Sequence, residues 1–329
     1  MKPPRYWNRP PSALSRMLAP LGIYALGTRR RLAKSTPHTL SISVISIGNL
    51  NAGGTGKTPV AIALMEMITA TGLKPHVVSR GYGGRLEGPH RVQDTDSPAD
   101  VGDEPLLLAA FGPVWVAKDR ATGGEAAQEA GADIVILDDG HQNPSLTKTV
   151  SIVVIDADIG FGNRNAMPVG PLRETVPEGL ARADCVVLIG SPEACTACKN
   201  VTPELSKLPV FTGALTPLAT GMPWSGMPVF AFAGIGRPEK MFATLRSLGA
   251  DLRGTRAFDD HEPYAPMVLT RLEATAKDLG AQLVTTEKDA VRLPLSFRKK
   301  VLTLPVRLVF DDPAGFAEAI NEKLNQPSS

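Results

Sequence analysis

The glycine-rich stretch at residues 48–58, which ends in Gly56-Lys57-Thr58, has the residue types and spacing of a phosphate-binding loop. Such a loop wraps backbone N–H groups around phosphates, brings its lysine to the outer phosphates and places its hydroxyl on Mg²⁺. Asn51 stands where the strict pattern has glycine, and asparagine tolerates a left-handed backbone better than most residues. The segment therefore predicts binding of a nucleoside triphosphate, against the alternative of a plain turn between a strand and a helix. The residues expected to hold the phosphates are Asn51, Gly53, Gly54, Thr55, Gly56, Lys57 and Thr58.

Two adjacent carboxylates, Asp138 and Asp139, follow an apolar run at residues 134–137. Carboxylates at a strand end hold Mg²⁺ beside a phosphate loop in many nucleotide-binding sheets. Mg²⁺ usually takes one or two carboxylates and fills its other positions with phosphate oxygens and water. We therefore expect Asp138, Asp139 and Thr58 on the metal side, which favours phosphoryl transfer or hydrolysis over simple binding.

Transfer of a phosphoryl group to a hydroxyl also needs a base, and two parts of the chain offer one. Asp103 and Glu104 stand at the expected start of a helix, where the N-terminus favours anions. Such a pair is also a common helix cap. His261 is the second candidate because the ordinary pKa of histidine lies near neutral pH. A single histidine in a loop often has no chemical role, so the residue types alone leave these alternatives open.

Two further segments combine glycines with cations. Residues 79–84 contain Arg80 and Tyr82, and residues 160–174 contain Arg173. Backbone freedom beside a cation suits a loop that covers an anionic substrate. Both segments are equally consistent with ordinary surface loops, which are rich in glycine and proline.

The rest of the sequence predicts the elements that position these residues. Apolar runs of strand length alternate with helical patterns, which predicts an α/β fold like that of phosphate-loop NTPases: a mostly parallel sheet with helices on both faces. The expected strands are residues 42–47, 76–79, 114–117, 134–137, 152–155 and 186–189, and the expected helices are residues 58–71, 104–110 and 124–130. Ligands bind at the carboxyl ends of the strands in such sheets. The candidate residues should therefore meet at one edge.

A stretch rich in Gly and Pro at residues 216–228 has the composition of a linker between two domains. We expect a phosphate-loop kinase domain over residues 36–215. A smaller C-terminal α/β domain over residues 229–329 is expected to close the active-site cleft. Its expected strands are residues 229–233, 283–285 and 301–304, and its expected helices are residues 238–248 and 313–324.

Residues 1–35 form a basic leader, because the first acidic residue of the chain is Glu66. Its cations are Lys2, Arg5, Arg9, Arg16, Arg29, Arg30, Arg31 and Lys34, and its apolar residues at helical spacing are Leu14, Met17, Leu18 and Leu21, followed by Ile23, Tyr24 and Leu26. An apolar face with cationic flanks suits a helix that lies in the headgroup region of an anionic membrane. The alternative is a helix packed on its own domain with a solvated basic face. The apolar segment is too short to span a bilayer and lacks a signal-peptide cleavage site.

The 329 residues carry a net charge of only +2 and three cysteines. Three cysteines cannot form a disulfide framework, and a phosphate loop needs cytosolic nucleotide, so we expect a reducing compartment. Cys195 and Cys198 form a C-x-x-C pair without further zinc ligands nearby, which favours a structural role.

The motifs gain meaning from their order along the chain. In sequence they are Gly48-Asn-Leu, Gly-Gly-Thr-Gly-Lys57-Thr-Pro, Ser-Arg80-Gly-Tyr82, Gly-Asp103-Glu104-Pro, Leu-Asp138-Asp139-Gly-x-Gln142, Pro-x-Gly-Pro-Leu-Arg173-Glu, Ala-Gly-Ile-Gly-Arg237-Pro, Asp260-His261 and Thr-Thr-Glu-Lys288-Asp289-Ala. This order resembles the tetraacyldisaccharide 4′-kinase family of lipid A biosynthesis. The resemblance implies a bacterial kinase on the cytoplasmic face of the inner membrane. Such an enzyme uses ATP and Mg²⁺ to phosphorylate the 4′-hydroxyl of a tetraacyldisaccharide 1-phosphate, which gives lipid IVA.

The resemblance also implies residue roles and partners. Asp103 is expected to accept the 4′-hydroxyl proton, with His261 orienting it and Lys57 holding phosphate. Glu104 is expected at the metal or the nucleotide. The residues expected on the substrate side are Arg80, Tyr82, Gln142 and Arg173, and Arg120 fits the pattern without an assigned role. The expected partners are the lipid substrate and an anionic membrane surface, with no nucleic acid.

The chain departs from the family pattern downstream of Gln142. Asn143 stands where many members have histidine, and Lys148-Thr149 stands where an Arg-Asp pair often ends the segment. The nucleotide side is unaffected by these departures, which lie in the segment downstream of Gln142.

Two other functional classes compete with the kinase. A nucleotide-dependent switch or assembly ATPase on a membrane often carries an additional lysine early in its phosphate loop, which Asn51-Ala52-Gly53 does not offer. A non-catalytic module that binds anionic lipids would leave Gly-Lys-Thr and Asp-Asp unexplained. Acceptor-dependent consumption of ATP would separate a kinase from a switch.

Overall fold

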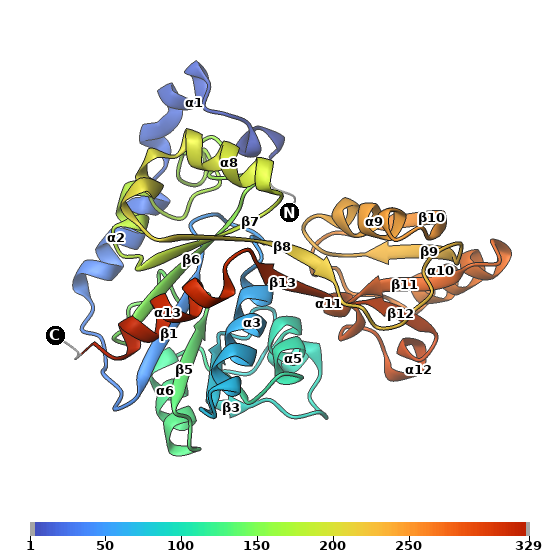
Figure 1. The fold of residues 1–329 in the computed structure, drawn as a ribbon, viewed down its shortest axis with the longest axis horizontal. Coiled ribbons are helices and arrows are strands. Elements are labelled where there is room, and N and C mark those ends of the chain that lie inside the picture. Colours follow the sequence, from blue (N-terminus) through green and yellow to red (C-terminus); the bar gives the residue numbers. More distant parts are fainter. Residues whose placement is uncertain (1–3, 327–329) are drawn as a thin grey trace.

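The apolar runs of the sequence form the strands of two sheets, each in its own α/β unit (Figure 1). The computed structural model describes residues 4–326, so Lys2 of the leader lies outside the described residues. The first unit carries the larger sheet and the second unit the smaller one. An N-terminal helical segment lies against the first unit.

Within the described residues, nine strands form the larger sheet in the order β13-β8-β7-β6-β1-β5-β2-β4-β3. Their bounds are β1 Ser43–Gly48, β2 Pro75–Ser79, β3 His90–Arg91, β4 Val114–Val116, β5 Ile134–Asp138, β6 Val150–Asp156, β7 Cys185–Ile189, β8 Val210–Pro217 and β13 Val306–Phe310. The strands from β8 to β4 are parallel, and the edge strands β13 and β3 are antiparallel to their neighbours. The prediction of a mostly parallel sheet is confirmed.

Helices cover both faces of this sheet, because successive strand residues point to opposite sides. Ile45 and Ile47 of β1 share one core with α3, α5 and α13, whereas Val44 shares another core with α6. Helices α7 and α8 pack on the β6 and β7 residues of the second face. The helix bounds are α3 Lys57–Ala70, α4 Pro98–Val101, α5 Asp103–Ala109, α6 Arg120–Glu129, α7 Val176–Leu180, α8 Pro192–Val201, the 3₁₀ helix η3 Pro203–Lys207 and α13 Pro313–Leu324. Cys195 and Cys198 of α8 are free thiols and are buried in the core that α7 and α8 form with β6 and β7.

The second unit has a smaller parallel sheet in the order β10-β9-β11-β12, again with helices on both faces. Helix α9 packs in one core and helices α10 and α12 pack in the other. The bounds are β9 Pro228–Ala233, α9 Pro238–Ser247, β10 Asp251–Ala257, α10 Pro266–Asp278, β11 Gln282–Thr286, α11 Glu287–Ala290, α12 Leu295–Arg298 and β12 Val301–Leu304. Strand β10 and helix α10 were not anticipated from the sequence.

The expected boundary of the second domain is wrong at its C-terminal end. The second unit ends at β12, and the chain then returns to the first unit through β13, which pairs with β8 from Val306 opposite Pro217 (Figure 1). Helix α13 follows β13 and buries Phe316 and Ile320 in the core of the first unit. The two units are therefore joined by two antiparallel strands and not by the single linker that was expected at residues 216–228.

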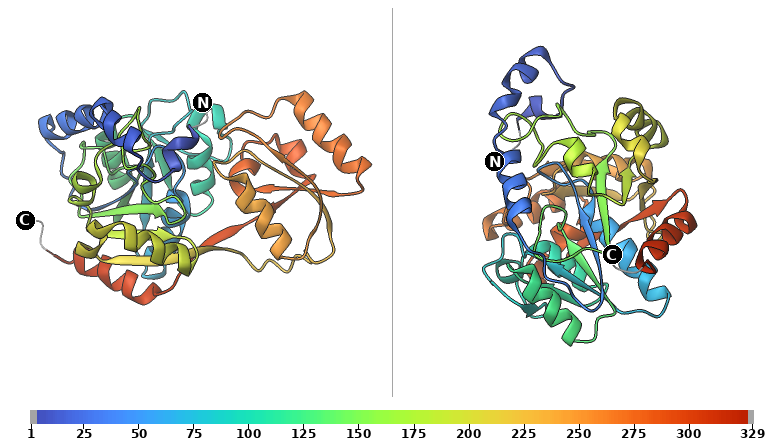
Figure 2. Two further views of the ribbon diagram at one scale, coloured as in Figure 1. Left: turned by 90° about the horizontal axis from the view of Figure 1, so that it is seen from above. Right: turned by 90° about the vertical axis from the view of Figure 1, so that its left-hand side faces the viewer.

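The described part of the leader, residues 4–35, forms four short elements and not one continuous helix. They are the 3₁₀ helix η1 Arg5–Asn8, α1 Ala13–Leu18, the 3₁₀ helix η2 Ala19–Leu21 and α2 Tyr24–Lys34. Both views of Figure 2 show this segment on the first unit, where Asn163 N donates to Trp7 O at 2.8 Å. The exposed large apolar side chains of the leader include Met17, Leu21, Ile23, Tyr24 and Leu26. None of the helices between residues 4 and 326 is long and apolar enough to cross a membrane.

Candidate active site

The glycine-rich loop runs from the end of β1 to the start of α3, at the carboxyl edge of the larger sheet. Gly53 and Gly56 have φ values of 121° and 94°, which favour glycine. A Cβ atom added at Gly53 or Gly54 would meet nothing within 4 Å, so this part of the loop faces open space. The N-terminus of α3 directs its free N–H groups toward the same space.

Asn51 is accommodated for a different reason from the one expected. It is not among the described residues with a positive φ. Its side-chain Nδ2 donates to Gly160 O at 3.0 Å, and its backbone forms a bridge with Leu172. Asn51 therefore fastens the loop to the segment of residues 160–172.

Asp139 lies between two cations at the end of β5. Lys57 Nζ is 3.4 Å from Asp139 Oδ1, and Arg173 Nη1 donates to both carboxylate oxygens at 2.9 Å. Burial by itself would raise the pKa of Asp139, but the charges of Lys57 and Arg173 outweigh burial and lower the pKa to about 2. Asp139 is thus ionised at neutral pH and balances the loop lysine.

Asp138 is fully enclosed and has one free oxygen. Ser79 Oγ donates to Oδ2 at 2.9 Å, whereas Oδ1 has no hydrogen-bond partner among the described residues. Burial and the nearby charge of Glu104 raise the pKa of Asp138 to about 6, against the opposing charge of Lys57. A buried carboxylate oxygen without a partner beside a phosphate loop fits a Mg²⁺ ion, a hard cation that prefers oxygen ligands.

We expect Asp138→Asn to stabilise the protein in the absence of metal and nucleotide. The folded-state pKa is raised from 3.8 to about 6, so the folded protein holds the proton more tightly and loses stability as pH rises through this window. Differential scanning fluorimetry should show a higher Tm for the variant at pH 8 and a smaller difference near pH 4. A lower Tm for the variant at pH 8 would mean that Lys57 already stabilises the charged form.

A second group of side chains assembles around Asp103, the first residue of α5. His261 Nδ1 lies 2.9 Å from Asp103 Oδ2, although 158 residues separate the two in sequence. Burial by itself would raise the pKa of Asp103, but the hydrogen bond with His261 and the charges of Lys288 and Arg292 hold it below its ordinary value. The hydrogen bond with Asp103 raises the pKa of His261, against the effect of burial.

The cations around Asp103 come from the second unit. Lys288 Nζ lies 3.2 Å from Glu104 Oε1 and 3.3 Å from His261 Nε2. Arg292 Nε is 4.0 Å from Asp103 Oδ2 and has no hydrogen-bond partner among the described residues. Arg292 is held in place by Asp289 and by Gly234 O, to which its Nη2 donates. Neither Lys288 nor Arg292 is among the site residues expected from the sequence, although Lys288 lies in one of the motifs.

The residues expected on the substrate side lie in different places. Arg80 is exposed, and Tyr82 is exposed with its ring edge-on to His261, at 5.7 Å between centroids. Gln142 is buried, and its Nε2 donates to Asn49 O and Glu174 Oε1. These two bonds fasten the turn after Asp139 to the start of the glycine-rich stretch.

Arg173, Arg120 and Glu104 also have partners inside the protein. Arg173 was expected on the substrate side and contacts Asp139, as described above. Arg120 is buried and donates to Ala117 O and to the backbone oxygen of Asp138, so it holds the end of β5. Glu104, expected at the metal or nucleotide, pairs with Lys288. Thr58 is half-buried in the first turn of α3.

The segment that departs from the family pattern supports the turn after Asp139. Lys148 Nζ donates to Gly140 O at 2.7 Å and to His141 O at 2.9 Å. Thr149 Oγ1 accepts from Val44 N, and Asn143 Oδ1 accepts from Ser145 N. Lysine at position 148 therefore serves as a hydrogen-bond donor to the turn that carries Asp139.

The site has two charged groups at one edge of a parallel sheet. The first group consists of the phosphate loop with Lys57 and the two carboxylates at the end of β5, Asp138 and Asp139. The second group consists of Asp103, His261 and Lys288. The charge of Glu104, next to Asp103, raises the pKa of Asp138, so the two groups lie within electrostatic reach. This fold and this site define a phosphate-loop protein of the NTPase-like α/β class.

Comparison with known proteins specifies the family within this class. The family model of the tetraacyldisaccharide-1-P 4′-kinase matches residues 14–325. The tetraacyldisaccharide 4′-kinase of Dinoroseobacter shibae is 55% identical over 98% of this chain and 97% of its own length, and that of Jannaschia sp. is 51% identical over 99% and 100%. The chain belongs to the tetraacyldisaccharide 4′-kinase family, which confirms the resemblance seen in the motifs.

A solved structure shows the same fold. The crystal structure of LpxK from Aquifex aeolicus, described as an "apo" form in complex with ATP, aligns with a TM-score of 0.74 at 24% identity. The alignment covers 94% of this chain and 99% of that chain. Both units and their connection therefore belong to one shared architecture.

Proposed function

We propose that this chain transfers the γ-phosphate of ATP to the 4′-hydroxyl of a tetraacyldisaccharide 1-phosphate, with Mg²⁺, at the cytoplasmic face of the inner membrane. Membership of the 4′-kinase family supports the reaction. The Aquifex aeolicus LpxK structure contains ATP, which supports ATP as the donor. The arrangement of the chain's own side chains supports the division of roles given below.

The phosphate loop and α3 hold the triphosphate. Gly53 and Gly54 leave space for phosphate oxygens against the backbone, and Lys57 approaches them from the first turn of α3. Thr58 and Asp138 are the side chains that would hold Mg²⁺, since Asp139 is already paired with Lys57 and Arg173. When bound, Mg²⁺ neutralises charge on the transferred phosphoryl group.

Asp103 is the proposed base for the acceptor hydroxyl. Its lowered pKa keeps it ionised at neutral pH, which a proton acceptor requires. His261 donates a hydrogen bond to Asp103 and thereby orients the carboxylate. The single observation that carries the proposal is the pairing of Asp103 in the first unit with His261 in the second. Asp103 is adjacent to Glu104, whose charge acts on Asp138 at the nucleotide side.

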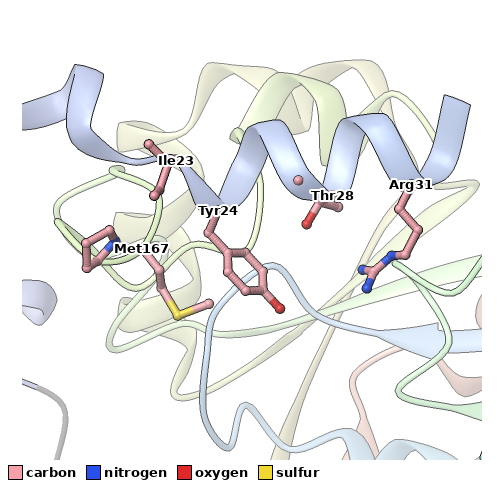
Figure 3. Close-up of a pocket in the computed structure, with 7 residues that line it drawn as sticks. Ile23, Tyr24, Thr28, Arg31 and Met167 are labelled. Carbon is pink, nitrogen blue, oxygen red and sulfur yellow. The ribbon is translucent and has the colours of Figure 1, made fainter.

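A cavity of about 550 Å³ lies between α2 and the loop of Met167 and Pro168 (Figure 3). Tyr24, Thr28 and Arg31 line it from one side of α2, and all three point into it in the close-up. Thr28 Oγ1 donates to Arg173 O at 3.1 Å, so the cavity borders the Asp139 cluster. An apolar wall with an arginine suits an amphipathic lipid with anionic groups. We propose that the acceptor enters here from the membrane.

The decisive assay measures transfer of radiolabelled γ-phosphate to tetraacyldisaccharide 1-phosphate against a control with water alone. The proposed kinase activity predicts a labelled lipid product that forms only when the acceptor is present. Equal release of phosphate with and without acceptor would favour a nucleotide switch, and absence of ATP turnover would favour a lipid-binding module.

We expect the leader to bind anionic membranes through its exposed apolar side chains. The variant Leu21→Ser with Ile23→Ser should sediment much less with vesicles that contain an anionic phospholipid, because both side chains are exposed beside the cluster Arg29-Arg30-Arg31. Point variants are preferable to truncation, since removal of α2 would also remove the bond between Thr28 and Arg173.

A matched control for this measurement lies in the second unit. Met267 and Leu295 are equally exposed there, at 66% and 73%. The variant Met267→Ser with Leu295→Ser should sediment like the wild type. Loss of sedimentation in both double variants, or in neither, would contradict a membrane-binding role that is specific to the leader.

A further inference from the structure

Lys288 lies at the start of α11, directly after β11 and at the carboxyl edge of the second sheet. Thr286 caps this helix by accepting from Asp289 N, and Thr286 Oγ1 donates to Asp289 Oδ2. The side chain of Lys288 is 19% exposed and reaches across to the first unit. The proposed function gives this half-buried lysine no role.

Three polar groups surround the Lys288 ammonium. Glu104 Oε1 is 3.2 Å from Nζ, His261 Nε2 is 3.3 Å away and Asp260 Oδ1 is 3.5 Å away. Burial by itself would lower the pKa of Lys288, but the charges of Glu104, Asp260 and Asp103 raise it above its ordinary value. The ammonium therefore carries three N–H donors and no acceptor.

The contacts with Lys288 and with the ionised carboxylate of Asp103 both favour the same tautomer of neutral His261, each from its own side of the ring. Because Lys288 can only donate, Nε2 must accept, which leaves the hydrogen on Nδ1. Nδ1–H then donates to Asp103 Oδ2 at 2.9 Å. The opposite tautomer has a poor alternative, since the nearest carboxylate to Nε2, Asp260 Oδ1, is 3.7 Å away and beyond hydrogen-bond length.

Lys288 and His261 also form two parallel contacts between the units. Asp103 and Glu104 are adjacent at the start of α5, and each pairs with a different residue of the second unit. The pair of Lys288 with Glu104 keeps the ammonium next to Nε2, while the pair of His261 with Asp103 uses the other ring nitrogen. Lys288 therefore takes part both in the contact between the two units and in the orientation of Asp103, the proposed base.

We infer that Lys288 is a positioning residue for the phosphoryl transfer: it fixes the Nδ1–H tautomer of His261 and so the hydrogen bond that orients Asp103. This inference rests on the proposed function of Asp103. Loss of the ammonium frees Nε2 to carry the hydrogen and turn toward Asp260. The lone pair of Nδ1 then faces the Asp103 carboxylate, and the orienting hydrogen bond is lost.

The kinetic test compares Lys288→Met, which keeps the length of the side chain but not its donors, with Lys288→Arg, which keeps donors. Since acid–base groups contribute about 10²- to 10⁴-fold to such rates, we expect Lys288→Met to reduce kcat by about 10- to 100-fold. The KM for ATP should change by no more than about twofold, because the phosphate loop is intact. Lys288→Arg should recover much of the lost kcat.

The control is Lys240→Met, which removes a lysine that also joins the two units. Lys240 Nζ contacts Asp156 and Asp158, and Arg237 keeps both of these carboxylates paired in the variant. Turnover close to that of the wild type is expected for Lys240→Met. An equal loss of kcat in Lys240→Met and Lys288→Met would overturn the inference, because a weakened interface would then explain both.

A spectroscopic test does not depend on turnover. Long-range ¹H–¹⁵N correlation spectra at a pH of about 9, well above the ordinary pKa of histidine, report the tautomer of each neutral imidazole. His261 should show Nδ1–H in the wild type and in Lys288→Arg, and a shift toward Nε2–H in Lys288→Met, with the signal assigned by its absence from His261→Gln. Nε2–H in the wild type would overturn the inference.

These outcomes separate the inference from the proposed function. Normal turnover in Asp103→Asn would remove the proposed base, whatever Lys288 does. An inactive Asp103→Asn together with normal turnover in Lys288→Met would overturn the role of Lys288 alone. Thermal unfolding of each variant confirms that the kinetic values refer to folded protein.

Discussion

Replacement of Asp103 by Asn should reduce transfer to the lipid acceptor by about 10²- to 10⁴-fold, the range typical for loss of a general base. Asparagine has the same shape and can still accept the hydrogen bond from His261, but it cannot take up a proton. Acceptor-dependent transfer of labelled phosphate measures this loss. ATP affinity, measured by calorimetry, should stay close to that of the wild type because Lys57 and the glycine-rich loop are unchanged.

Asp158→Asn is a suitable control for this experiment. Asp158 is also a carboxylate that faces the second unit, and it pairs with Arg237 and Lys240 while Asp156 accepts from the same two cations. Its turnover should therefore remain near that of the wild type. Retention of turnover in Asp103→Asn would show that another group, or no group, removes the proton.

Replacement of Lys57 by Met should impair the nucleotide half of the reaction. Loss of one preorganised donor to developing charge costs about 10²- to 10³-fold in kcat in enzymes where it has been removed. Lys57 is held at its place by Asp139, so its ammonium is already aimed at the phosphate site before nucleotide binds. We expect both weaker ATP binding and slower transfer, measured by calorimetry and by the labelled-phosphate assay.

The fold should survive this substitution. Asp139 keeps its two contacts with Arg173 when Lys57 is lost, so this carboxylate is not left without a cation. Lys118→Met is the matched control, because the Lys118 ammonium pairs with Glu87 on the exposed surface, away from the glycine-rich loop. Wild-type kcat and ATP affinity in Lys57→Met would exclude the glycine-rich loop as the phosphate site.

The two largest expected effects thus fall on different halves of the site. In the proposed mechanism Lys57 acts on the donor and Asp103 on the acceptor, and the two residues belong to neighbouring charged groups.

The donor half of the site could be predicted from sequence because its residues are close along the chain. The loop of residues 49–56 joins the end of β1 to Lys57 and Thr58 at the start of α3, while Asp138 ends β5 and Asp139 follows it. In a parallel sheet both of these points lie at the carboxyl edge, and β1 and β5 are neighbours in the sheet. Local pattern and one rule of topology are therefore enough to bring Lys57 near Asp139.

Local pattern misled the prediction at the chain's C-terminal end. Local pattern also does not show the internal partners of Gln142, which are Asn49 and Glu174. Strand β13 was not among the expected strands, and the expected helix at residues 313–324 fits either unit. Only the free edge of β8 and the apolar core beneath α13 assign them to the first unit.

The sequence by itself determined the phosphate loop, the carboxylates beside it and the parallel sheet that carries both, since each depends on residues near one another in the chain. Only the tertiary structure decided the acceptor half. Asp103 and His261 are 158 residues apart, and Glu104 and Lys288 are 184 apart. Periodicity shows which face of an element is buried but not which distant element covers it. The partners of Asp103 are therefore fixed by how the second unit packs on the first.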